Sequence, residues 1–237
     1  MKLCRLSARS GGKDNALPEP YRVGVYYAPS PNDPLWQAGC TWLGRDAVTG
    51  LTLPQPDLPG LAAHTADPRR YGLHGTLKAP FAPRLGFDAF LRAATDFAAT
   101  CGVFPLPALA VTNLRGFLAL CPVEPAPELH HLADECVKHL DAHRTPENTS
   151  TQAQRGMGKT LRQRAYLGQW GYPFVFEDFY FHMTLTGQMQ SNPYFDAACA
   201  HFQTSLAQAR QVDSLAIFVE EHKGSPFRLF CRLAFAT

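Results

Sequence analysis

Two short, similar stretches decide the predicted fold: His74-Gly75-Thr76-Leu77 and His182-Met183-Thr184-Leu185. They lie 108 positions apart, and at the same offset Phe87-Asp88-Ala89 matches Phe195-Asp196-Ala197. Of the sixteen positions from 74 to 89, six are identical in the second copy without a gap. Self-similarity at a fixed spacing is typical of internal repeats, and two copies favour a pair of related halves.

The order of the predicted elements repeats as well. Strand-forming residues and helical periodicity predict strand, helix, strand and strand over residues 71–121, and again over 176–235. The helices of the two copies are expected over 87–100 and 194–209. We therefore expect two similar lobes around one shared cleft, with residues 21–237 forming a single two-lobed catalytic domain.

The sequence outside the repeat predicts fewer regular elements. A strand is expected over 21–27, and helices are expected over 34–42 and 125–143. The proline-rich residues 50–70 and the polar residues 144–157 are expected to be loops.

The composition is typical of a globular protein. Of the 237 residues, 46% are hydrophobic and 18% are charged, which excludes a disordered chain, and the net charge of +2 argues against a long nucleic-acid partner. No apolar run has the length of a membrane-spanning helix. Residues 1–20 lack the apolar core of a secretory signal and are expected to form a disordered extension. The seven cysteines have no C-x-x-C spacing, so we expect a cytoplasmic protein with free thiols and no structural zinc.

Strand alternation sorts the residues of the two motif strands onto two faces. In the first copy His74, Thr76 and Lys78 are expected on one face, and in the second copy His182, Thr184 and Thr186. Apolar residues occupy the opposite face of each strand. A polar row on a central strand requires water or a ligand, because an unpaired buried polar group is costly.

Two such rows facing one cleft are suited to phosphodiester cleavage. A neutral histidine can accept a proton from a nucleophile, and a protonated one can donate a proton to the leaving oxygen. Thr76 and Thr184 can donate hydrogen bonds to the non-bridging phosphoryl oxygens. This chemistry needs no metal and no cofactor, and none is predicted. The repeat makes His74 and His182 equivalent, so the choice of acid and base stays open.

The paired motifs resemble the H-x-[ST]-x signatures of the two-histidine (2H) phosphoesterase superfamily. The wider phrases over 71–81, 170–175 and 181–187 resemble one uncharacterised branch, the proteins associated with bacterial phosphonate-utilisation operons. The resemblance covers the chain from about Tyr21 to its end and leaves residues 1–20 unmatched.

This resemblance implies an α+β fold with two pseudo-symmetric lobes whose antiparallel sheets line a central cleft. It implies hydrolysis or reversible transesterification of cyclic phosphates or 2′-linked phosphodiesters, with His74, Thr76, His182 and Thr184 as the catalytic residues. The operon association suggests a cyclic ribose phosphate as the substrate, by analogy alone.

Six further residues are weaker candidates for substrate binding. Lys78 and Thr186 follow the catalytic pairs on the same predicted faces, although Lys78 is equally consistent with a solvated strand end. The aromatic residues Tyr71, Tyr172 and Tyr180 lie near the motif strands, where packing is the alternative role. Arg162, within the basic stretch Arg155–Arg164, is a candidate for a second phosphate of the substrate, and a solvated helix face is the alternative.

Two other functions stay open. One is an RNA-end-processing phosphodiesterase or ligase, and the other is a nucleotide-phosphate-binding protein without catalysis. The favoured hypothesis is a cyclic phosphodiesterase with a small phosphorylated substrate, no membrane partner and an oligomeric state that the sequence leaves undetermined.

Overall fold

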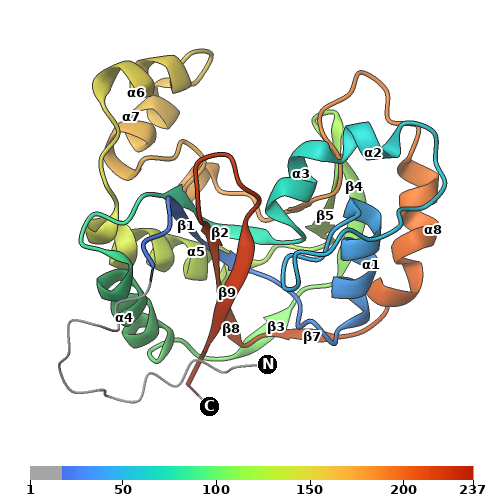
Figure 1. Cartoon of the computed structure of the whole chain (residues 1–237), viewed down its shortest axis with the longest axis horizontal. Helices are drawn as coiled ribbons and strands as arrows, with labels where there is room; N and C mark the ends of the chain where they lie inside the picture. The colour runs from blue at the N-terminus through green and yellow to red at the C-terminus, as the bar shows by residue number, and fades with distance from the viewer. Residues whose placement is uncertain (1–17, 237) are drawn as a thin grey trace.

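The computed structural model describes residues 18–236 and shows helices covering a large antiparallel sheet, which confirms the predicted α+β class (Figure 1). The strands are β1 (Arg22–Tyr27), β2 (Gly75–Phe81), β3 (Phe104–Leu106), β4 (Leu109–Leu114), β5 (Phe117–Pro122), β6 (Met183–Thr184), β7 (Arg210–Val212), β8 (Ser214–Glu220) and β9 (Arg228–Ala234). The helices are α1 (Pro34–Leu43), α2 (Leu61–His64), α3 (Ala66–Tyr71), α4 (Phe87–Ala98), α5 (Pro127–Leu140), α6 (Thr149–Arg155), α7 (Leu161–Trp170) and α8 (Phe195–Leu206). In this part of the chain, no helix combines the length and apolar character needed to cross a bilayer.

The two motif strands are neighbours at the middle of the sheet. Its strand order is β4-β5-β6-β2-β1-β8-β9, and β3 pairs with β7 in a separate two-stranded sheet. Gly75 lies opposite Met183 where β2 meets β6, and Phe104 lies opposite Val212 where β3 meets β7. Both pairs are 108 positions apart, which is the offset of the sequence repeat. A two-fold axis between antiparallel strands places equivalent residues opposite one another, so both registers are those expected of two-fold-related repeats.

The two copies of the repeat are interleaved in space. Helices α4 and α8 both have twelve residues, and they begin at equivalent positions, Phe87 and Phe195. Helix α4 packs on β9 of the second copy, whereas α8 packs on β4 of the first. Likewise β5 of the first copy pairs with β6 of the second. Strand β1 lies outside both copies of the repeat, yet it takes the place beside β2 that β5 takes beside β6.

One face of the sheet carries the main core. Alternate residues of β1 and β8, such as Val23, Val25 and Ile217, are fully buried beneath the helices of both copies. The neighbouring residues Tyr26 and Phe218 point to the opposite face, where they join a smaller apolar cluster. The histidines and threonines of the two motifs also lie on this second face, whereas Leu77, Met183 and Leu185 belong to the main core.

Three segments differ from the sequence-based expectation. The predicted loop over 50–70 contains α2 and most of α3, because Pro68 falls in the first turn of α3, where a proline is tolerated. The expected loop over 144–157 contains α6. The predicted strand over 176–186 is reduced to β6, because the chain turns at Phe176 with a φ of 53° and forms a short 3₁₀ helix.

The predicted extension over residues 1–20 lies outside the described residues except for its last three. Within these, the Glu19 carboxylate accepts hydrogen bonds from the Phe87 backbone N–H at 3.0 Å. Glu19 therefore supplies the N-terminal cap that Gly86 cannot give to α4.

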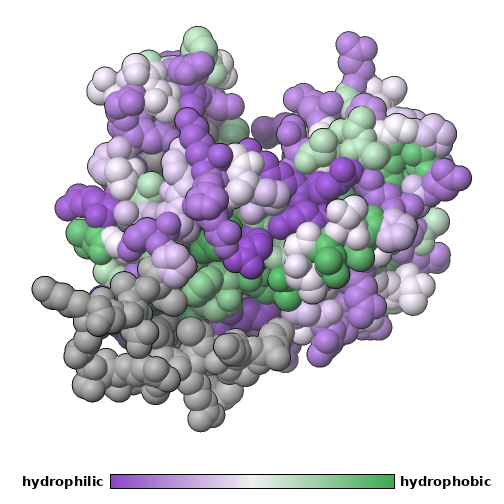
Figure 2. All heavy atoms as spheres, viewed as in Figure 1, coloured by the Kyte–Doolittle hydropathy of each residue, from purple (hydrophilic) through white to green (hydrophobic). Residues whose placement is uncertain are grey.

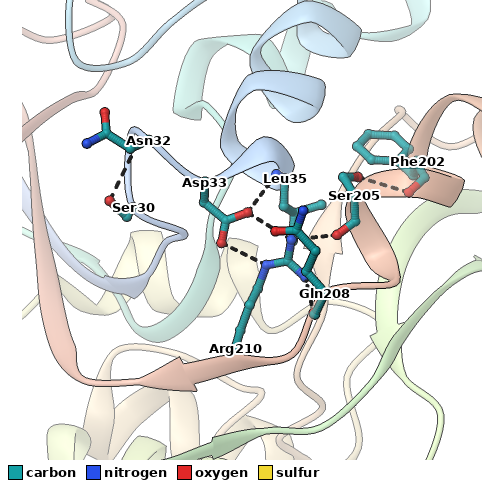
Figure 3. Close-up of polar contacts among 8 residues, drawn as sticks. All are labelled: Ser30, Asn32, Asp33, Leu35, Phe202, Ser205, Gln208 and Arg210. Carbon is teal, nitrogen blue, oxygen red and sulfur yellow. Dashed lines mark hydrogen bonds and ion pairs between the residues drawn. The ribbon is translucent and has the colours of Figure 1, made fainter.

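An ion pair joins the start of α1 to β7, beside the end of α8 (Figure 3). Asp33 accepts a hydrogen bond from the Leu35 N–H at 2.7 Å, which caps α1, and it also receives two bonds of 2.8 Å from Arg210. The same guanidinium donates to the carbonyl of Ser205 near the end of α8. Helix α1 in turn holds the second motif strand, because the Trp42 indole N–H donates to the Leu185 carbonyl at 3.1 Å.

Candidate active site

The register between β2 and β6 brings the four predicted catalytic residues together. With Gly75 opposite Met183, His74 lies opposite Thr184, and Thr76 lies opposite His182. Directly opposite residues in an antiparallel pair have Cα atoms about 5 Å apart, and diagonal neighbours are about 7–8 Å apart. One phosphoryl group placed over the Gly75–Met183 pair is therefore within reach of all four side chains.

Both histidines make the same hydrogen bond. The Nδ1 atom of His74 lies 2.8 Å from the carbonyl oxygen of Gly72, and the Nδ1 atom of His182 lies 2.8 Å from that of Tyr180. Because a carbonyl oxygen only accepts, each Nδ1 carries the proton, and each neutral ring keeps the Nε2 lone pair free. The two acceptors, Gly72 and Tyr180, are themselves 108 positions apart.

The surroundings of the two histidines differ. The His74 ring packs against Tyr26 with 4.0 Å between ring centroids, and Phe218 lies at 6.2 Å. Burial lowers the pKa of His74 to about 4, the hydrogen bond to Gly72 opposes this shift, and repulsion from His182 adds to it. Burial also lowers the pKa of His182, whose ring lies 5.6 Å from the Phe117 ring.

The two threonine hydroxyls are available to a ligand. Thr76 and Thr184 are half-buried, and neither hydroxyl forms a hydrogen bond with a residue of the described chain. Each can therefore donate to an oxygen held above the sheet.

A β-bulge follows each motif, and it changes the positions of two of the predicted substrate-binding residues. The consecutive residues Tyr26 and Val25 of β1 pair with Thr76 and Lys78 of β2, which are two positions apart. The extra residue in β2 reverses the alternation of its side chains, so Lys78 points to the other face. Its ammonium is buried and lies 3.0 Å from Asp141 Oδ1. Lys78 is therefore part of the core beneath α5, and the predicted contact with substrate is wrong.

The same irregularity turns Thr186 inward. The backbone N–H groups of Leu185 and Thr186 both donate to the carbonyl oxygen of Leu118. The buried Thr186 hydroxyl accepts a bond from the Leu118 N–H at 2.9 Å, and Asn192 lies at 3.4 Å. Thr186 thus holds β5 against the motif segment, and its predicted role in substrate binding is wrong.

A pocket of about 550 Å³ opens beside the histidine pair. Its lining residues come from both motif strands, the β4–β5 turn and the segment after α7: Thr76, Leu77, Ala79, Leu114, Arg115, Phe117, Tyr172, Phe174, Val175, Glu177, Asp178, Phe179, Tyr180 and His182. Helices α6 and α7 form an arm that protrudes beside it, and Figure 2 shows a hollow between this arm and the part of the surface that carries α2 and α3.

The three predicted tyrosines lie near the histidines. Tyr172 and Tyr180 line the pocket, and Tyr180 is 52% exposed. Tyr71 lies 6.0 Å from the His74 ring and stacks on Phe227 at 4.9 Å. Tyr172 and Tyr180 can therefore contact a ligand in the pocket, whereas Tyr71 has a packing role beside His74.

Arg162 already has a partner. Its guanidinium donates two hydrogen bonds to Asp178, at 2.9 and 3.0 Å, from an exposed position on α7. The neighbouring Arg155 pairs with Glu147, and Arg164 donates to the Lys159 carbonyl. The three arginines of the basic stretch are therefore engaged by neighbouring groups of the protein.

Two residues of the site were missed by the sequence analysis. Tyr26 covers His74, and Gly24 makes room for it, since a Cβ there would lie 2.5 Å from the Tyr26 hydroxyl. Arg115 lines the pocket from the β4–β5 turn. The sequence showed a strand and a turn at these places, but no local pattern connects either residue with the histidines.

Comparison with known proteins gives a family and two relatives of greater length. Residues 76–228 match a family model described as a protein of unknown function (DUF1045). A protein named ribose 1,5-bisphosphate phosphokinase PhnN, from Janthinobacterium sp. (strain Marseille), is 37% identical over 230 residues, which cover 91% of this chain and 51% of the relative. Its namesake from Laribacter hongkongensis (strain HLHK9) is 38% identical over 224 residues, 90% of this chain and 51% of the relative. The chain thus spans about half the length of these curated relatives.

Solved structures of similar arrangement include E. coli LigT complexed with 3′-AMP, with a TM-score of 0.48 and 13% identity over 92% of this chain and 100% of that one. A structure described as a phosphoesterase has a TM-score of 0.45 at the same identity and coverage.

Proposed function

Because the chain belongs to the DUF1045 family of proteins of unknown function, we propose its activity from its own residues: it is a metal-independent phosphodiesterase that hydrolyses a small cyclic phosphate. The observation that carries this proposal is the pairing of Gly75 with Met183. It sets two histidines and two threonines around a space that fits one phosphoryl group.

In the proposed reaction, a neutral histidine accepts a proton from water through Nε2 as the water oxygen bonds to phosphorus. The second histidine, protonated, donates its Nε2 proton to the ring oxygen as the P–O bond breaks, and the product is a phosphomonoester. Thr76 and Thr184 donate hydrogen bonds to the non-bridging oxygens, on which negative charge grows. These four side chains supply both proton transfers without a Lewis acid.

The surroundings of the histidines favour His74 as the base and His182 as the acid. His74 is enclosed by Tyr26 and Phe218, and its pKa of about 4 keeps it neutral near pH 7. His182 lines the open pocket, where an incoming anionic phosphate favours its protonated form.

A cyclic ribose phosphate is the substrate that we propose, within phosphonate catabolism. The support is the name of the curated relatives, which act on a ribose bisphosphate and carry the Phn designation of phosphonate genes. A pocket of about 550 Å³ has room for a phosphorylated pentose.

The test is hydrolysis of ribose and nucleoside cyclic phosphates by wild type, His74→Ala and His182→Ala. Removal of either proton-transfer group is expected to lower kcat by about 10²–10⁴-fold while the far-UV circular dichroism is unchanged. Activity in wild type should survive exhaustive treatment with a chelator.

The matched control is His222→Ala, which removes an exposed histidine from the turn after β8 and should keep full activity. Full activity in either motif variant would exclude the paired acid–base mechanism. Binding of cyclic phosphate without any product would favour a receptor instead of an enzyme.

A further inference from the structure

The turn between β4 and β5 has an unusual residue at its first position. Leu114 pairs with Phe117, so Arg115 and Gly116 form a two-residue hairpin turn, with φ values of 52° and 95°. Positive φ at both central residues is the requirement of a type I′ turn, in which Asn, Asp or Gly is preferred at the first position. An arginine is strained in this left-handed region, so turn stability does not explain Arg115.

The side chain of Arg115 belongs to the pocket of the histidine pair. It lines the same 550 Å³ pocket as Thr76 and His182. Phe117, two residues further along the chain, has its ring 5.6 Å from that of His182. Arg115 lies at the tip of this turn on the pocket wall beyond Phe117, so a small sugar phosphate held at His182 can extend towards it.

The charge of Arg115 is not neutralised within the described part of the chain. Its guanidinium has no hydrogen bond or ion pair there, whereas both carboxylates of the pocket have partners. Asp178 binds Arg162, and Glu177 accepts a hydrogen bond from the Tyr166 hydroxyl.

A second cation near the pocket is already engaged. The ammonium of Lys159 lies 4.9 Å from the centre of the Phe174 ring, in a cation–π contact. Arg115 is therefore a better candidate for binding a second phosphate than the basic stretch over 155–164 that the sequence suggests.

We infer that Arg115 binds a second phosphoryl group of the substrate, and that the enzyme selects cyclic phosphates that carry one. This inference rests on the proposed function and specifies its substrate class. The guanidinium and a phosphate form a charge-assisted, bidentate contact. The free energy of this contact offsets the conformational strain of Arg115 in the turn. Arg115 is a specificity-determining residue and takes no part in the proton transfers.

The experiment compares cytidine 2′,3′-cyclic phosphate with its 5′-phosphorylated form. Wild type is expected to show at least about tenfold higher kcat/KM for the phosphorylated form, mainly through a lower KM. The reason is that the unphosphorylated form cannot make the charged hydrogen bond to Arg115. Arg115→Asn should abolish this preference, because its loss of kcat/KM falls mainly on the phosphorylated form. Its melting temperature should equal or exceed that of wild type, because Asn is favoured in this turn. Arg115→Lys should keep part of the preference.

Arg92→Asn is the control, because it removes the same charge from an exposed position on α4 and should keep the preference. Equal activity of wild type on both substrates, or an equal loss on both in Arg115→Asn, would overturn the inference. If wild type hydrolyses neither substrate and no ribose cyclic phosphate either, the proposed function fails. Calorimetric binding of the two compounds then tests Arg115 by itself, and equal affinities of wild type for both would refute it.

Discussion

The burial of His74 connects catalysis with stability. Its native pKa of about 4 lies below the ordinary value of 6.5, so the unfolded chain binds a proton that the native protein does not bind between these pH values. The stability that comes from neutral His74 is therefore complete above pH 6.5 and is lost as the pH falls towards 4.

This pKa predicts how the free energy of unfolding depends on pH. Between pH 7 and pH 5, wild type should lose about 2 kcal/mol more than His74→Gln, whose side chain cannot be protonated. Urea unfolding at the two pH values measures the difference. His222→Gln should behave as wild type does. An identical pH dependence in wild type and His74→Gln would show that His74 titrates normally.

At the scale of the single element, the two bulges explain what the sequence analysis could and could not predict. Repeated motifs and patterning correctly located both histidine segments, and α4 and α8 begin at the repeat offset. Regular alternation failed two residues beyond each threonine, because a bulge turns Lys78 to the other face and Thr186 bonds the backbone of β5. The position of a bulge depends on the pairing with the neighbouring strand, so the sequence of β2 or β6 alone does not predict it.

The position of Lys78 predicts that its replacement affects folding rather than catalysis. Its ammonium is 3% exposed and bonds Asp141, which also receives bonds of 2.7 and 3.1 Å from Arg144. Lys78→Met fills the same space but breaks the pair, and the remaining Arg144 limits the cost to about 2 kcal/mol. Denaturant unfolding should show this loss, and the KM of the folded enzyme should be unchanged. A raised KM with an unchanged free energy of unfolding would instead show that Lys78 contributes to substrate binding.

The same limit applies to residues that reach the site from distant elements. Tyr26 lies 48 positions before His74 in the sequence, and it contacts that histidine only because β1 pairs with β2. Arg115 is brought to His182 by the pairing of β5 with β6. Local patterns predicted the elements that hold these residues, but not the strand order that makes them neighbours.

At the scale of the whole molecule, interleaving explains why a single site serves both copies of the repeat. The pair of Gly75 and Met183 lies where the two copies meet, so each copy contributes one histidine and one threonine. Each repeat helix also packs on a strand of the other copy. Neither half can complete the quartet alone, and each repeat helix is partly buried by the other half, so the fold and the site depend on contacts between the halves.

The α6–α7 arm is the exception to this shared packing, and its dynamics should differ. No residue of α6 is buried and α7 buries only Leu167, whereas α5 buries six residues, including Leu129 and Leu140. Local opening requires less free energy where few apolar side chains are buried. Amides of residues 149–170 should therefore exchange with deuterium on the order of 100-fold faster than those of α5. Equal protection of the arm and α5 would contradict this.

Because Tyr172 and Phe174 continue from the arm into the pocket wall, a bound cyclic phosphate should slow exchange in residues 171–178 more than in α5.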